Sequence, residues 1–110
     1  MSLASKSIFN LSLTAPAAVA GNTFVAADGS TAAPGAAAIG VAYTDAAAGE
    51  TFNASAVGTA LVVAGAAISG GQAVEVGANG DAVPHNSGVI VGYALGSVAA
   101  AGSYVEVFLK

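Results

Sequence analysis

The chain has 110 residues, carries a formal net charge of −4 and contains only two cationic side chains, Lys6 and Lys110. This length allows one domain, and a mean hydropathy of +0.77 argues against intrinsic disorder. The shortage of Lys and Arg side chains excludes nucleic acid and an anionic membrane surface as partners, because both are bound through clusters of cations.

The composition also contains few charged residues and no cysteine. No cysteine is present, so disulfides, thiolate metal sites and a cysteine nucleophile are excluded. Charged residues make up 7% of the chain, against about 25% of an average soluble domain. Such a surface exposes neutral and apolar area, which normally marks a contact with another protein. We therefore expect a subunit of an assembly.

The first predicted element is an N-terminal strand in which Phe9, Leu11 and Leu13 alternate with polar residues. We expect residues 1–13 to form an extended arm ahead of a single β domain of residues 14–110. The alternative is that this segment is the first strand of that domain. No apolar run of the chain approaches the about 20 residues that a membrane-spanning helix needs, so no membrane partner is expected.

The rest of the chain predicts strands, because glycine recurs every few residues and each interior glycine costs a helix about 1 kcal/mol. Alternating polar and apolar residues at 51–56 and 104–110 predict half-buried strands. Runs rich in β-branched residues at 39–43, 61–63 and 89–91 predict strands buried on both faces. The fold class is therefore mainly β, a small compact barrel or sandwich with short helical turns.

The last predicted strand has two different faces. Val105, Val107 and Leu109 point one way, and Tyr104, Glu106 and Phe108 point the other way. Because the second face is partly apolar, we expect it to meet another layer or another subunit.

Landmarks in the two halves of the chain recur in the same order about 50 residues apart, which indicates an internal duplication. The dipeptides Asp28-Gly29 and Asn79-Gly80 both favour hairpin turns. Other matching pairs are Pro34 with Pro84, Ile39-Gly40 with Val91-Gly92, and Ala47-Ala48-Gly49 with Ala100-Ala101-Gly102. We expect repeat units at 15–57 and 65–110, joined by a strand over 58–64.

No pattern of catalytic or metal-binding residues is present. His85 is the only histidine and lies in a polar loop, so we expect a structural role for it. Asp45 and Glu50 flank a short loop and are expected to solvate strand ends rather than to form an acid–base pair. A calcium site would need about six oxygen ligands, and no spacing among Asp28, Asp45, Glu50 and Asp81 resembles a calcium loop. We predict no enzyme activity, no cofactor and no metal.

Several short segments of the sequence are similar to segments of a known protein family. They are Thr14-Ala15-Pro16-Ala17, Ile39-Gly40-Val41-Ala42, Asp45-Ala46-Ala47-Ala48-Gly49-Glu50, Ile90-Val91-Gly92-Tyr93-Ala94-Leu95, Ala99-Ala100-Ala101-Gly102 and Val105-Glu106-Val107-Phe108-Leu109. Over residues 13–110 the chain thus resembles the capsid cement, or decoration, proteins of tailed bacteriophages.

The resemblance implies a small, mostly β virion protein, made in the bacterial host cytoplasm. Such proteins attach to the outer surface of the expanded capsid, usually as homotrimers over positions where neighbouring major capsid proteins meet. We expect the protein to stabilise the shell by clamping those neighbours. Our attachment hypothesis is that the arm adds a strand to the major capsid protein, with Ile8, Phe9, Leu11 and Leu13 as the capsid-binding residues.

Two other function classes compete with this interpretation. A secreted or surface-exposed β-rich adhesion module has a similar composition, and would require a signal peptide cleaved after Ala20. A small hydrolase or lyase would use Asp45, Glu50 or His85.

Overall fold

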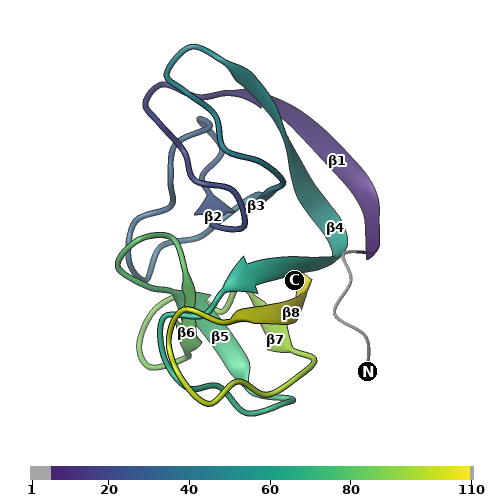
Figure 1. The fold of residues 1–110 in the computed structure, drawn as a ribbon, viewed down its shortest axis with the longest axis vertical. Helices are drawn as coiled ribbons and strands as arrows, with labels where there is room; N and C mark the ends of the chain where they lie inside the picture. The colour runs from purple at the N-terminus through teal and green to yellow at the C-terminus, as the bar shows by residue number, and fades with distance from the viewer. Residues whose placement is uncertain (1–5, 110) are drawn as a thin grey trace.

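Eight strands and the turns between them make up the described residues, 6–109, of this computed structural model, and side chains are described from residue 10 onward (Figure 1). The strands are β1 (Lys6–Thr14), β2 (Phe24–Val25), β3 (Gly40–Ala42), β4 (Thr51–Val63), β5 (Ala73–Val76), β6 (Ala82–Pro84), β7 (Gly92–Ala94) and β8 (Tyr104–Leu109). The mainly β prediction is confirmed. The short helical turns are not, since residues 6–109 contain no helix. Within this part of the chain, no helical segment has the length and apolar character of a membrane span.

The strands form one sheet that nearly closes into a barrel. Their order is β2-β3-β4-β8-β7-β5-β6, and β1 pairs with β4 outside this path. The two ends of the path meet, because the Phe24 amide at β2 donates to the Gly80 carbonyl just before β6, at 2.7 Å. Ala64, directly after β4, forms a parallel bridge with Ala82 of β6.

Strand β4 is longer than the sequence predicts, because one strand of 13 residues replaces the separate strands expected at 51–56 and 58–64. Its first half pairs with β3 and β1, its second half pairs with β8, and the pairing with β1 extends as far as Thr59. Gly58 lies between the two halves with a φ of 107°. Glycine adopts this conformation without strain, so the chain passes through an irregularity in the sheet without ending the strand.

The interior consists of two clusters of small side chains, both of which contain residues of β4. The largest side chains in the fully buried set are Phe24 and valines. Residues of this size remove little apolar area from water, at about 25 cal/mol per Å². The larger cluster includes Phe24, Val41, Ala60, Val62, Val74, Val76, Val105 and Val107, and the smaller one comprises Ala15, Val19, Val25, Ala42, Ala46, Phe52 and Ala54.

The N-terminal segment is not a free arm over residues 6–13. Strand β1 pairs antiparallel along β4, from Lys6 opposite Thr59 to Thr14 opposite Thr51. Leu13 also packs against the smaller cluster, so pairing and apolar burial both hold this segment on its own domain. The extended arm is therefore not confirmed for these residues, and residues 1–5 lie outside the described part of the chain.

The two halves of the chain repeat the same backbone contacts. The pairing of β1 with the first half of β4 matches the pairing of the second half of β4 with β8. In this match β1 corresponds to the second half of β4, and Leu13 opposite Phe52 corresponds to Val62 opposite Val105. The loops after these strands correspond as well. Val19 and Ala46 exchange two backbone hydrogen bonds of 2.8 and 2.9 Å, and Ile68 and Val98 exchange two of 3.0 and 2.9 Å.

These correspondences support a duplication with different limits from those expected. Because β1 matches the second half of β4, the first unit begins at β1 instead of at residue 15. We propose repeat units of 6–57 and 58–109. On this division β4 closes the first unit and opens the second.

Two glycines occupy equivalent places where a side chain does not fit. A Cβ atom on Gly40 would lie 2.4 Å from the carbonyl oxygen of Ser55, and one on Gly92 would lie 2.5 Å from that of Phe108. Both distances are far below ordinary van der Waals contact. The close approach of neighbouring strands therefore explains the matching glycines of Ile39-Gly40 and Val91-Gly92.

Candidate functional site

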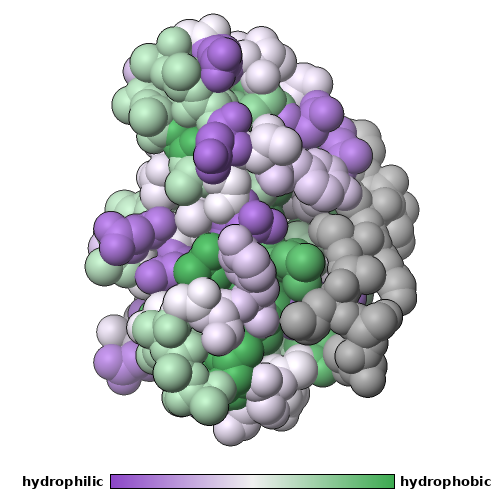
Figure 2. All heavy atoms as spheres, in the orientation of Figure 1, coloured by the Kyte–Doolittle hydropathy of each residue, from purple (hydrophilic) through white to green (hydrophobic). Residues whose placement is uncertain are grey.

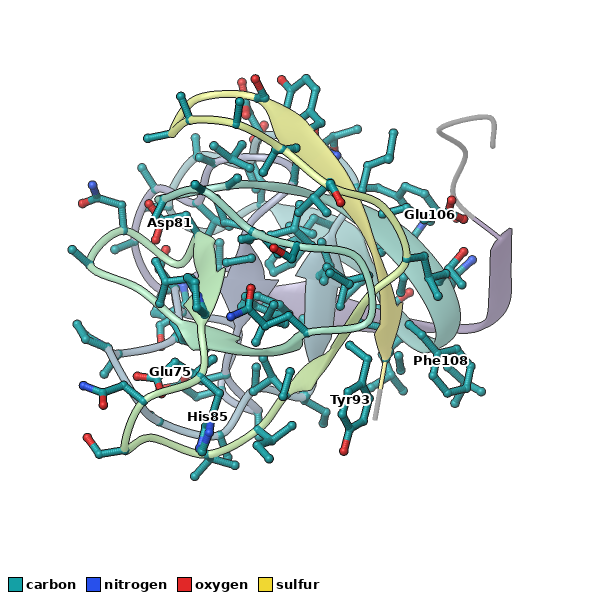
Figure 3. The ribbon with its side chains drawn as sticks, turned by 90° about the horizontal axis from the view of Figure 1, so that it is seen from below. Glu75, Asp81, His85, Tyr93, Glu106 and Phe108 are labelled. Atoms are coloured by element: carbon teal, nitrogen blue, oxygen red, sulfur yellow. The ribbon has the colours of Figure 1, made fainter. Side chains whose placement is uncertain are left out.

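The outer side of β4, β7 and β8 carries a group of exposed aromatic side chains. Tyr93 and Phe108 lie opposite each other on β7 and β8, and Figure 3 shows them side by side at the surface. Their exposed fractions are 37% and 51%, and that of Tyr104 is 50%. Leu61 and Leu95 lie half-buried on the same side. We call Tyr93, Tyr104, Phe108, Leu61 and Leu95 the aromatic face.

The one carboxylate among the described residues of β4, β7 and β8 is withdrawn from solvent. Glu106 lies between Tyr104 and Phe108 on β8 and is 3% exposed. The hydroxyl of Thr59 donates a hydrogen bond of 3.0 Å to its Oε2. Among the described residues of β4, β7 and β8, Glu106 alone carries a charge. The aromatic face therefore exposes large apolar groups with almost no charge, as protein contact sites do.

The face of the molecule in Figure 2 mixes hydrophilic and apolar residues. Hydrophilic residues form separate patches among pale and apolar ones. With only two cationic side chains in the sequence, the chain has too few cations for a basic stripe of the kind that binds nucleic acid.

The candidate acid–base residues each form a hydrogen bond with the backbone of a loop. The Gly21 amide donates to Oδ1 of Asp45, and the Ala47 amide donates to Oε1 of Glu50, both at 2.7 Å. The Gly70 amide donates to the Ser97 hydroxyl in the second half of the chain, at the place that corresponds to Asp45. Because Ser97 stands in the second half of the chain where Asp45 stands in the first, we interpret the hydrogen bond of Asp45 as part of the loop structure and not as part of a catalytic site.

His85 belongs to a loop that a different carboxylate organises. Oε1 of Glu75 accepts hydrogen bonds from the amides of Asn86 and Gly88, at 2.6 and 3.0 Å. The bond from Asn86, followed by that from Gly88, holds the pKa of Glu75 below its ordinary value. Nε2 of His85 lies 2.9 Å from the Gly88 carbonyl oxygen in the same loop. Sequence reasoning did not identify Glu75.

The candidate residues do not converge on one site. None of the hydrogen bonds recorded for residues 10–109 joins Asp45, Glu50 and His85 to one another. Within the described residues, no group of three or more His, Asp or Glu side chains is arranged to hold a metal ion.

The structure places the predicted capsid-binding residues on β1. Leu11 and Leu13 are half-buried, while Ser12 and Thr14 between and after them are exposed. The side chains of Ile8 and Phe9 lie outside the described residues. Figure 1 shows β1 along the outer side of β4.

Asn22 has a structural role that sequence reasoning missed. It has a positive φ of 62° and its Nδ2 donates to the Leu61 carbonyl at 3.0 Å, while its own carbonyl accepts from the Val63 amide at 2.9 Å. One residue thus occupies the backbone edge of β4 beside Leu61 and Val63. The signal in the sequence was an asparagine after Gly21, a residue type that tolerates the left-handed conformation.

A comparison of the sequence with models of known protein families identifies the family of this chain. The family model described as phage cement protein matches residues 4–109. The chain belongs to the phage cement protein family. Membership makes it a structural, capsid-associated phage protein, and the family is one of virion components that are generally not enzymes.

A solved structure agrees with the fold. It is described as the crystal structure of the head fiber gp8.5 N base in bacteriophage phi29, and it superposes with a TM-score of 0.78 over 93% of each chain, at 24% identity. At this identity the likeness concerns the fold. The search of curated proteins found no match.

Proposed function

We propose that the protein binds the outside of the phage capsid and stabilises it by clamping neighbouring major capsid proteins. The observation that carries this proposal is the family match over residues 4–109. The aromatic face supports it, because large apolar side chains with almost no exposed charge suit a permanent contact with another protein.

The clamp acts by mass action. A ligand that binds the assembled lattice and not its separated subunits shifts the equilibrium toward the lattice. A binding surface that spans two capsid subunits has this selectivity, because half of it is missing when the subunits separate. Virion heat resistance should therefore rise with occupancy.

We propose a homotrimer as the bound form. The interior contains mostly alanine and valine, so one subunit buries little apolar area per residue. Association of three copies adds burial, and a surface of small neutral side chains has few charges to desolvate. We further propose β1 as the capsid-binding element, with Ile8, Phe9, Leu11 and Leu13 along it. The protein is made in the host cytoplasm and acts on the virion.

The test uses expanded capsids that lack cement protein. We expect the purified protein to sediment with these capsids, to raise their melting temperature, and to scatter light with the mass of three protomers. Phe108→Ser on the aromatic face is expected to weaken binding, whereas Ala100→Ser on an exposed loop is a matched surface control. A folded protein that sediments apart from expanded capsids refutes the proposal.

A further inference from the structure

The hairpin turns at Asp28-Gly29 and Asn79-Gly80 share one backbone conformation. Their glycines have positive φ angles of 90° and 75°. In each turn the glycine amide donates to the carbonyl three residues earlier, at 3.0 Å in the first repeat and at 3.4 Å in the second. The amide nitrogen of Gly80 is therefore held more loosely than that of Gly29, and the side chains of residues 28 and 79 are the main difference between the turns.

Asp28 of the first turn is held by two hydrogen bonds. Its Oδ1 accepts from the amide and from the hydroxyl of Ser30, at 3.0 and 2.6 Å. The hydroxyl bond, followed by the amide bond, holds the pKa of Asp28 below its ordinary value. A carboxylate that stays ionised resists attack by the amide nitrogen of the next residue, because its negative charge is spread over both oxygens. The first turn is therefore chemically stable.

Asn79 of the second turn lacks this protection. Its side chain is exposed, and no hydrogen bond of its side-chain amide is recorded among the described residues. Asp81, which has no hydroxyl, stands where Ser30 stands in the first repeat. The neutral amide of Asn79 keeps an electrophilic carbonyl carbon, and Gly80 has no Cβ atom to shield its own nitrogen. Of the five asparagines in the chain, Asn79 alone precedes a glycine.

We propose that Asn79 is a site of spontaneous deamidation, and that its isoaspartate product loosens the contact that closes the sheet. Asparagine is among the thermolabile residues. The Gly80 nitrogen forms a bond to Cγ of Asn79, the side-chain nitrogen leaves as ammonia together with the Gly80 proton, and a succinimide ring results. Water then opens the ring at one carbonyl to give aspartate or at the other to give isoaspartate. One water is consumed and one ammonia is released, with no oxidation or reduction.

The contact that closes the sheet depends on the position of Gly80. Its carbonyl accepts from the Phe24 amide at 2.7 Å, where the two ends of the strand path meet. Gly80 is tightly enclosed, since a Cβ atom on it would lie 2.7 Å from Cγ2 of Thr31 and 3.1 Å from the Phe24 carbonyl oxygen. In isoaspartate the main chain runs through the side-chain carbons, which inserts one extra carbon atom before Gly80. Because close packing leaves no room for this atom, Gly80 must move away from Phe24.

The test incubates the purified protein in mildly alkaline buffer at physiological temperature and maps the products by mass spectrometry of peptides. We expect Asn79 to lose its side-chain amide before the other asparagines, so that the net charge of −4 becomes one unit more negative. Hydroxylamine should cleave the succinimide between residues 79 and 80, and an isoaspartyl methyltransferase should label the opened product. Asn79→Gln is the matched control, because its longer side chain cyclises far more slowly, and it should keep its charge over the same period.

Hydrogen exchange measures the structural consequence in the same incubated protein. Molecules with isoaspartate should lose protection at the Phe24 amide and keep it along β8. Asn79→Asp carries the added charge without the added carbon atom, and should keep the protection of Phe24.

Three results overturn the proposal. They are an intact Asn79 after another asparagine has reacted, full protection of the Phe24 amide in molecules with isoaspartate, and equal loss of that protection in Asn79→Asp, which would make the charge the cause. Because the experiment uses no capsid, each result leaves the cement function standing.

Discussion

The sharpest stability prediction concerns the equivalent glycines of the two repeats. In Gly92→Ala the new Cβ would lie 2.5 Å from the Phe108 carbonyl oxygen and 2.6 Å from Cγ1 of Val107, whereas ordinary contacts begin at 3.4 Å. The Val107 methyl group can rotate, but the oxygen belongs to the backbone of β8. The two strands must therefore separate by about 1 Å, which strains a buried part of the sheet.

The expected size of the effect follows from two opposing contributions. Overpacking of this kind costs about 1–3 kcal/mol, and an obstacle made of backbone places Gly92→Ala near the upper end. Alanine also restricts the unfolded chain, which returns about 0.4–1 kcal/mol. We expect a net loss of about 2 kcal/mol in the free energy of unfolding, or about 10 °C in Tm for a domain of this size.

Urea denaturation followed by circular dichroism measures this loss. Gly40→Ala should lose a similar amount, because its Cβ would lie 2.4 Å from the Ser55 carbonyl oxygen. Gly96→Ala is the control, since no atom lies within 4 Å of its Cβ position and its φ is not positive. It should be as stable as the wild-type protein or slightly more stable. A Gly92→Ala protein within about 0.5 kcal/mol of the wild-type protein would contradict the reasoning from strand separation.

Three further predictions concern single side chains. Phe24→Ala empties the site of the largest fully buried side chain and should lower the free energy of unfolding by about 3–5 kcal/mol in urea titrations; a loss below about 1 kcal/mol would show that the cluster collapses around the cavity. Asn22→Gly keeps the positive φ but loses the hydrogen bond to Leu61, and should lower the free energy of unfolding by about 1 kcal/mol. Asn22→Ala loses the same bond and adds about 1–2 kcal/mol of strain, because alanine does not favour the left-handed conformation. Equal losses of stability in the two variants would exclude that strain. Glu75 has a lowered pKa in the folded state, so its contribution to stability is present above the ordinary carboxyl value of 4.5 and is lost as the pH falls through its folded pKa. Stability measured from neutral to acidic pH should therefore fall more steeply in the wild-type protein than in Glu75→Gln, and parallel curves would refute this role.

The exposed aromatic face and the interior of small residues both follow from the small side chains that dominate the composition. A chain of mostly methyl-sized side chains builds a sheet with closely spaced strands, as Gly40 and Gly92 show, but it has few large groups to bury inside. Some of its largest apolar side chains, Tyr93, Tyr104 and Phe108, remain on the outside. In an assembly such groups contribute to the contact instead of to the fold of the subunit.

Much of this protein follows from the sequence alone. Glycine spacing excludes long helices, alternation on Tyr104–Leu109 separates the buried valines from the aromatic face, and the absence of Arg and Cys excludes several kinds of chemistry. The matching glycines favour the proposed duplication, because neighbouring strands come equally close at Gly40 and at Gly92. These properties depend on neighbouring residues or on composition, which the sequence displays directly.

Only the tertiary structure decided how the strands combine. Alternation predicts a strand at residues 8–13 but does not say which strand pairs with it, so the arm and the first strand of the sheet were equally compatible with the pattern. Likewise, Gly58 was compatible with a break or with a continuous β4. The closure of the β4 edge at Leu61 and Val63 by Asn22 depends on residues far apart in the chain. Strand pairing is a long-range contact between backbone groups that every residue type carries, and for this reason side-chain patterns leave it undetermined.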